Sequence, residues 1–220
     1  MPEFDEGAGR LSFKLVYYGP AQSGKTSNLM RLHDLVRAEL KGELMTLETQ
    51  SDRTLFFDLL PLGMRAPSGL LVKLRLFTVP GQVQHDGTRK AVLSRADGVV
   101  FVADSQRREA SNNAEAFQNL ADNAARVGLD FEHLPLVVQF NKRDLPDIAP
   151  EVEILARYAA TPWPVSFATA SRGEGVMQSL AQLLAAVYRR HDADCGLSAR
   201  HGLSAEGFLQ AFAGPAGVAV

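Results

Sequence analysis

The feature that most restricts the fold of this 220-residue chain is the stretch GPAQSGKTSN, Gly19 to Asn28. An apolar, strand-like run, LSFKLVYY, comes directly before it, and a run with apolar residues at helical spacing follows. Within the stretch, Gly19, Gly24, Lys25 and Thr26 fit the pattern G-x-x-x-x-G-K-[ST]. The glycines let backbone N–H groups wrap around a phosphate, and the amino end of the following helix adds a favourable partial charge. The sequence therefore predicts a nucleotide site in an α/β fold.

The side chains of this loop have separate predicted roles. Lys25 would pair with the outer phosphates of a nucleotide, and the hydroxyl of Thr26 would bind Mg²⁺. The expected nucleotide contacts in this segment are Gly19, Ala21, Gln22, Ser23, Gly24, Lys25, Thr26 and Ser27.

Strand-like and helix-like runs alternate along the rest of the chain. Three apolar runs have the composition of strands and span residues 70–79, 98–105 and 134–142. Three other runs show helical spacing and span residues 111–128, 150–160 and 174–191. Ser111 is a good capping residue at the start of the first of these helices. The alternation predicts a doubly wound, mostly parallel sheet with helices on both faces, which is the P-loop NTPase form of the α/β class.

We divide the chain into three parts. Residues 1–9 are expected to be flexible, residues 10–192 to form the nucleotide-binding domain, and residues 193–220 to form a flexible or partner-dependent tail. Within that tail, SAEGFLQAF has the pattern of a short amphipathic helix. Residues 41–69 are less regular, and we expect one or two strands with a mobile loop there.

A second motif, NKRD from Asn141 to Asp144, follows the strand-like run LPLVVQF, so it is predicted to lie at the carboxyl end of a strand. Aspartate can accept from both the ring N–H and the exocyclic amine of guanine, whereas adenine offers no such pair of donors. Leaving that aspartate unpaired against adenine would be costly, so the motif favours guanine. Further on, in the stretch ATAS, the backbone N–H of Ala170 could reach the guanine oxygen.

The composition argues against several classes of partner. A formal net charge of -2 gives no support to binding of nucleic acid or of an anionic membrane surface, because both attract basic patches. The single cysteine, Cys195, cannot form an internal disulfide, which favours a cytoplasmic protein. No apolar run approaches the roughly 18 to 20 residues that span a bilayer, so we expect no intrinsic membrane anchor.

Taken in order along the chain, GPAQSGKT, TVPGQ, NKRD and TAS resemble the motifs of Ras-like small GTPases. The longer runs SDRTLFFDLLP, LFTVPGQV and NKRDLP are more similar to the bacterial MglA-type polarity GTPases. The resemblance covers about residues 10–190 and implies a small-GTPase domain that binds GTP and GDP with Mg²⁺.

The resemblance also implies roles for individual residues. Thr54 would close on Mg²⁺ and the γ-phosphate, and Gly81 would meet the γ-phosphate through its N–H. Arg53 would act as a built-in arginine finger, and Gln82 would orient the attacking water. Lys142 would flank the base through its aliphatic stem. The implied metal ligands are Thr26 and Thr54, and the implied base contacts are Asn141, Lys142, Asp144, Thr169 and Ala170.

Two positions depart from the Ras-like pattern. Thr78 stands where the second motif normally begins with an aspartate that holds Mg²⁺ through water, so Asp52 or Asp58 would have to compensate. Ala21 stands where the family normally has glycine, close to the space that Gln82 and the arginine finger share. A misplacement of about 1 Å there could slow hydrolysis on the order of a hundredfold, although a shifted loop could also absorb the methyl group.

These features predict an MglA-like GTP/GDP switch that acts in cell polarity or surface motility. The resemblance implies a roadblock-fold (MglB-like) partner that promotes hydrolysis or exchange, polarity or motility effectors, and recruitment by partners to a cell pole or membrane complex. Ala21 and Thr78 favour an alternative function, that of a GTP-binding scaffold with very slow hydrolysis. Two further alternatives are an interaction protein that acts through its tail and an ATP-dependent P-loop enzyme.

Overall fold

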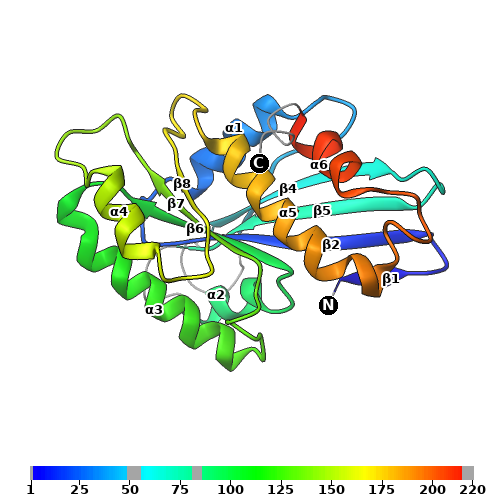
Figure 1. Cartoon of the computed structure of the whole chain (residues 1–220), viewed down its shortest axis with the longest axis horizontal. Coiled ribbons are helices and arrows are strands. Elements are labelled where there is room, and N and C mark those ends of the chain that lie inside the picture. The colour runs from blue at the N-terminus through cyan, green and yellow to red at the C-terminus, as the bar shows by residue number, and fades with distance from the viewer. Residues whose placement is uncertain (1, 49–55, 81–85, 215–220) are drawn as a thin grey trace.

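The structure of this chain is a computed structural model that describes residues 2–48, 56–80 and 86–214. Within these residues, eight strands form one sheet in the order β3-β4-β5-β2-β6-β7-β8, with β1 beside β2 (Figure 1). The strands are β1 (Glu3–Asp5), β2 (Arg10–Tyr18), β3 (Met45–Glu48), β4 (Phe56–Arg65), β5 (Leu71–Thr78), β6 (Gly98–Asp104), β7 (Leu136–Asn141) and β8 (Val165–Phe167). The helices are α1 (Lys25–Leu35), α2 (Asp86–Leu93), α3 (Ala110–Arg126), α4 (Glu151–Tyr158), α5 (Val176–Cys195) and α6 (Ala205–Ala213).

The predicted mostly parallel α/β sheet is confirmed. Strands β5, β2, β6, β7 and β8 run parallel to one another, whereas β3 pairs antiparallel with β4, β4 with β5, and β1 with β2. A tight turn connects β4 to β5, in which the Ala66 N–H donates to the Leu70 carbonyl at 2.9 Å. Because that connection is too short for a crossover helix, β5 must run antiparallel to β4. Residues 41–69 therefore contain two strands in their described part.

Helices cover both faces of the sheet and enclose two hydrophobic cores. One core lies beneath α1, α5 and α6, and the other beneath α2, α3 and α4 (Figure 1). Every residue of β6 and of β7 is buried, in agreement with their continuous apolar runs. In β5, by contrast, buried and half-buried residues alternate with the period of a strand. None of the described helices is long and apolar enough to cross a bilayer.

In the described part of the predicted flexible or partner-dependent tail, residues 193–214, the chain is largely helical and packs against the domain. Helix α5 continues to Cys195, and α6 packs beside it with Phe208 and Phe212 almost completely buried. Phe208 contacts the rings of Phe13 and Tyr188, with centroids 6.0 and 5.6 Å apart. Our prediction followed the Gly, Ala and Ser content of the segment and gave too little weight to its two aromatic residues, which are four positions apart. Together they place enough apolar area on one helical face to hold the segment against the sheet. The expected amphipathic helix within SAEGFLQAF is present.

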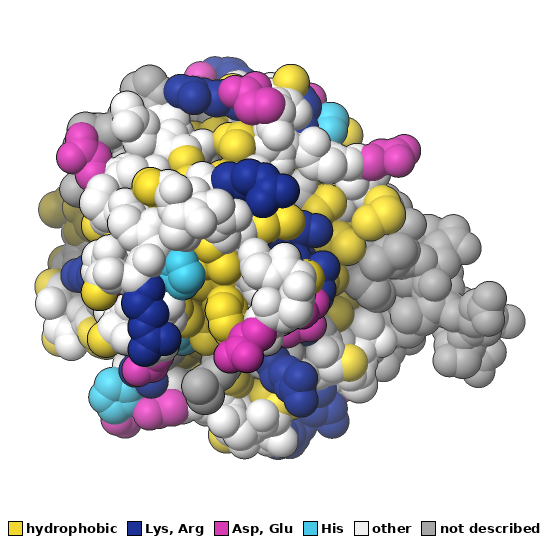
Figure 2. Space-filling view, turned by 90° about the vertical axis from the view of Figure 1, so that its right-hand side faces the viewer, with side chains coloured by type: hydrophobic (Ala, Val, Ile, Leu, Met, Phe, Trp, Pro, Cys, Tyr) yellow, Lys and Arg dark blue, Asp and Glu magenta, His cyan; other side chains and the backbone are white. Residues whose placement is uncertain are grey.

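Two smaller predictions, on the first residues of the chain and on the start of α3, also differ from the structure. Residues 3–5 of the predicted flexible start form β1, and the Arg75 guanidinium of β5 donates to Glu3 at 2.7 Å. Ser111 is not the cap of its helix, because a 3₁₀ turn at Arg107–Glu109 leads directly into α3 at Ala110. Figure 2 shows the end of the molecule that carries β1, where basic and acidic side chains are interspersed around small hydrophobic patches.

Candidate functional site

The predicted phosphate loop connects the carboxyl end of β2 to the first turn of α1. Gly19 and Gly24 have φ angles of 142° and 99°, a region that residues with side chains rarely adopt. A Cβ atom at Gly19 would lie 2.2 Å from the Val102 carbonyl oxygen, and one at Gly24 would lie 2.2 Å from the Asn141 amide nitrogen. Both glycines are therefore required by the neighbouring strands β6 and β7 as well as by the backbone of the loop.

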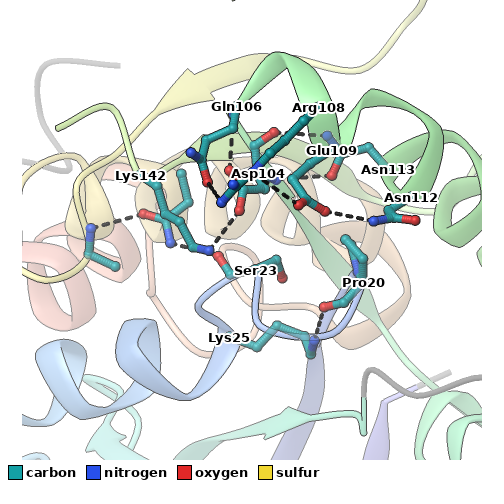
Figure 3. Close-up of polar contacts among 12 residues, drawn as sticks. Pro20, Ser23, Lys25, Asp104, Gln106, Arg108, Glu109, Asn112, Asn113 and Lys142 are labelled. Carbon is teal, nitrogen blue, oxygen red and sulfur yellow. Dashed lines mark hydrogen bonds and ion pairs between the residues drawn. The ribbon is translucent and has the colours of Figure 1, made fainter. Parts of the chain in front are cut away.

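Lys25 and Ser23 provide polar groups that turn into this loop. Lys25 is 7% exposed, and its ammonium donates to the carbonyl oxygens of Gly19 and Pro20 at 3.0 and 2.6 Å (Figure 3). The Ser23 hydroxyl is buried and has no hydrogen-bond partner in the described part of the chain. Ala21, in contrast, is exposed. The loop thus holds a cation against its own carbonyls and keeps a hydroxyl unsatisfied, which fits an oxyanion as the missing partner.

Asn141 ties three segments together. Its side-chain amide donates to the Ser23 carbonyl at 2.8 Å, and its side-chain oxygen accepts from the Ala170 N–H at 2.9 Å. The side chain is 2% exposed. The residue predicted as a base contact therefore joins the phosphate loop to the ATAS segment. The Ala170 N–H, which we expected to reach the guanine oxygen, is directed to Asn141 here.

Lys142 is held by a residue that the sequence reasoning missed. Its ammonium lies 2.6 Å from a carboxylate oxygen of Asp104, at the end of β6, in the view of Figure 3. The other oxygen of Asp104 accepts from the Gln106 N–H at 3.0 Å, and Asn113 of α3 bonds both backbone groups of Asp104. The signal that could have identified Asp104 is an acidic residue directly after a fully apolar strand.

Asp144 presents its carboxylate to solvent. The side chain is exposed, and one oxygen accepts from the Ser171 hydroxyl at 3.3 Å. The Ser171 carbonyl in turn accepts from Arg31 of α1 at 2.7 Å. Thr169 is buried, and its N–H donates to the Glu174 carbonyl at 3.0 Å. These contacts bring the NKRD and ATAS segments to the same edge of the sheet as the phosphate loop.

A buried polar network, also missed from the sequence, lies beneath the loop. The Gln139 amide of β7 donates to Asn28 of α1 at 2.9 Å and to Ser179 of α5 at 2.8 Å. Asn28 donates to the Gly24 carbonyl at 3.0 Å, and Ser179 donates to the Gly175 carbonyl at 2.9 Å. Three of these side chains have no exposed surface. The network connects the phosphate loop to the helix that follows the ATAS segment.

Replacing Gln139 with leucine is expected to lower the free energy of unfolding by about 1–3 kcal/mol, because the buried oxygen of Asn28 loses its donor. Urea denaturation of the full chain measures this loss. The control is Gln118→Leu on the exposed face of α3, which should change the free energy of unfolding by less than about 0.5 kcal/mol. Equal stability of Gln139→Leu and the native chain would contradict a stabilising role for the network.

The groups predicted to hold a metal are only partly described. Thr26 is exposed at the first turn of α1, and Thr78 is 3% exposed at the end of β5. The predicted residues Asp52, Arg53, Thr54, Gly81 and Gln82 lie outside the described residues, as does the side chain of Asp58. Among the residues that are described, no group of three or more His, Cys, Asp or Glu side chains could hold a metal ion.

Comparison with known proteins gives one informative similarity. No protein-family model matches the chain. It is similar to the mutual gliding-motility protein MglA of Myxococcus xanthus (strain DK1622), with 44% identity over 170 residues. The aligned region covers 77% of this chain and 87% of the relative.

Proposed function

Because this chain belongs to the MglA family of Ras-like small GTPases and therefore binds a guanine nucleotide, we propose that it is a Mg²⁺-dependent switch that hydrolyses GTP slowly. One observation carries the proposal. Asn141 bonds both Ser23 of the phosphate loop and Ala170 of the ATAS segment, so the phosphate and base regions form one continuous edge. That edge lies at the carboxyl ends of the parallel strands, where open α/β sheets bind ligands.

The loop would bind the phosphates with groups that are already oriented. The backbone N–H groups of the proposed contacts, Gly19 and Ala21 to Ser27, would surround them, and the α1 amino end would add a partial positive charge. The Lys25 ammonium, now bonded to two carbonyls of the loop, would pair with the outer phosphates. The Ser23 hydroxyl, which has no partner among the described residues, would gain an acceptor.

The base would be read at the opposite end of the same edge. The exposed Asp144 carboxylate would accept from the ring N–H and the exocyclic amine of guanine. The stem of Lys142, held by Asp104, would cover one face of the base. Asn141 and the buried Thr169 would support this contact from below. The Ala170 N–H would divide its hydrogen bond between Asn141 and the guanine oxygen.

Thr26 and Thr54 would hold the metal. When bound, Mg²⁺ would neutralise negative charge on the outer phosphates. Within the proposed mechanism, Gln82 orients the attacking water, Gly81 donates its N–H to the γ-phosphate, and Arg53 neutralises charge on the transferred group. These assignments rest on the family motifs of the sequence.

A competition experiment tests this proposal. The full chain is loaded with a fluorescent GTP analogue in the presence of Mg²⁺, and unlabelled GTP, GDP or ATP is added. We expect GTP and GDP to displace the analogue at concentrations at least about 100-fold below those of ATP, and released phosphate to appear in a single turnover. Equal competition by ATP would contradict the guanine site, and guanine binding without any released phosphate would favour the scaffold.

The scaffold is the second candidate function, and two residues favour it. Ala21 adds a methyl group to the loop, and Thr78 supplies no carboxylate at the end of β5. Both changes would affect hydrolysis more than binding, because the binding groups of the loop are Lys25 and the backbone. In this reading, the bound nucleotide stabilises a surface that partners recognise.

The cellular role is part of the same proposal. The relative is named for gliding motility, and we extend to this chain a role in surface motility or cell polarity. A roadblock-fold (MglB-like) partner would promote hydrolysis or exchange. The chain would act in the cytoplasm, with residues 10–192 as its nucleotide domain, and partners would recruit it to a cell pole or membrane complex.

A further inference from the structure

The first residue of α2, Asp86, is bound by several side chains of α3. Asn123 donates to one carboxylate oxygen at 2.8 Å and Asn119 donates to the same oxygen at 3.5 Å. Arg126 lies 3.4 Å from the second oxygen, which Lys90 of the same helix approaches to 3.1 Å. Three side chains of α3 thus hold the first turn of α2 through a single carboxylate.

The same two asparagines also bind Tyr18, the last residue of β2. The Tyr18 hydroxyl donates to the side-chain oxygen of Asn119 at 2.5 Å and accepts from the Asn123 amide at 3.1 Å. The Asn123 amide nitrogen, whose two hydrogens are shared among these acceptors, also lies 3.0 Å from the Asn119 side-chain oxygen. Tyr18 directly precedes Gly19 in the sequence, so its hydrogen bonds to α3 are made at the point where β2 ends and the phosphate loop begins. A continuous hydrogen-bonded path therefore runs from that strand, through α3, to the start of α2.

The members of this path have little freedom to move independently. Tyr18 and Asn123 have no exposed surface, and Asn and Asp side chains are short, so a hydrogen bond fixes their position closely. The hydrogen bond from Asn123, followed by those from Lys90 and Asn119, lowers the pKa of Asp86 to about 2. The carboxylate is therefore charged and able to accept at every physiological pH.

We propose that Tyr18, Asn123 and Asp86 are positioning residues that fix the first turn of α2 relative to the phosphate loop. The inference rests on the proposed function, because the segment immediately before Asp86 holds Gln82, the residue assigned to the attacking water. A shift of the first turn by about 1 Å would move the chain that leads to Gly81 and Gln82, whereas Lys25 and the base contacts Asn141 and Asp144 would keep their places. Because most of the proposed nucleotide contacts lie outside this segment, the path would affect the rate of hydrolysis much more than the affinity for GTP.

Two variants test the two ends of the path in the full chain with GTP and Mg²⁺. Tyr18→Phe removes only the hydroxyl, and Asp86→Ala removes the carboxylate. Each is expected to increase hydrogen exchange of the α2 amides about tenfold and to slow single-turnover GTP hydrolysis about 5- to 20-fold, while the dissociation constant for GTP changes less than twofold. Tyr158→Phe on α4 and Asp122→Ala on the exposed side of α3 are matched controls, and both should behave as the native chain.

Rescue by a conservative variant separates positioning from general destabilisation. Asp86→Asn keeps an acceptor for Asn123 and should recover at least half of the lost rate, whereas a merely structural effect would follow the melting temperature. Unchanged exchange of α2 in Tyr18→Phe and Asp86→Ala would overturn the proposal, as would increased exchange with an unaltered hydrolysis rate. Where the native chain itself released no phosphate, the proposed function would fail and the exchange measurement alone would decide the positioning role.

Discussion

Replacing Asp144 with asparagine is expected to weaken GTP binding by about 100-fold or more. The carboxylate is exposed and accepts within the described structure only from Ser171, at 3.3 Å, so its main loss on substitution is the pair of hydrogen bonds to guanine. Hydrogen bonds to a charged group contribute about 1.5–3 kcal/mol each, and the asparagine amide would oppose one guanine donor with its own. Equilibrium titration with a fluorescent GTP analogue measures the change.

The nucleotide itself offers a control for this prediction. Xanthine carries an oxygen in place of the exocyclic amine of guanine, so an asparagine amide can donate to it, and Asp144→Asn should bind the xanthine nucleotide more tightly than the native chain does. Glu174→Gln, an exposed carboxylate in the neighbouring loop, is the matched protein control and should leave GTP affinity unaltered. If Asp144→Asn kept native affinity for GTP, the base would be read by another group.

Replacing Ala21 with glycine is expected to raise the rate of single-turnover GTP hydrolysis by up to about 100-fold, with little change in GTP affinity. The methyl group is exposed in the loop and would lie beside the groups that act on the γ-phosphate, whereas the contacts of Lys25 and Asn141 do not involve it. The measurement is phosphate release from preloaded chain after addition of Mg²⁺.

The matched control for this substitution is Ala38→Gly, an exposed alanine that follows α1 and lies away from the loop. It removes the same methyl group and should not alter the rate. Equal hydrolysis rates for Ala21→Gly and the native chain would show that the loop accommodates the alanine, and slow turnover would then have to come from another feature, such as Thr78.

Much of the fold follows from local patterns in the sequence. The apolar runs before GPAQSGKT and NKRD predicted β2 and β7, and the alternation of runs predicted the parallel sheet, because strand and helix periodicity are properties of neighbouring residues. The tail was less predictable. Phe208 and Phe212 become informative only once Phe13 and Tyr188, far away in the sequence, provide a surface against which they can be buried.

The sequence alone determined the phosphate loop, its order relative to NKRD and ATAS, and the α/β class, since each depends on residues that are close along the chain. Only the tertiary structure decided that Asp104 holds Lys142, that Gln139 joins Asn28 to Ser179, and that Asp86 shares its asparagines with Tyr18. Asp86 and Asn123 are separated by 37 residues, and Asn28 and Gln139 by 111. A single sequence does not indicate which distant residue will form a hydrogen bond with a given polar side chain. The partner is determined when strands and helices bury both groups, because an unpaired buried group is costly.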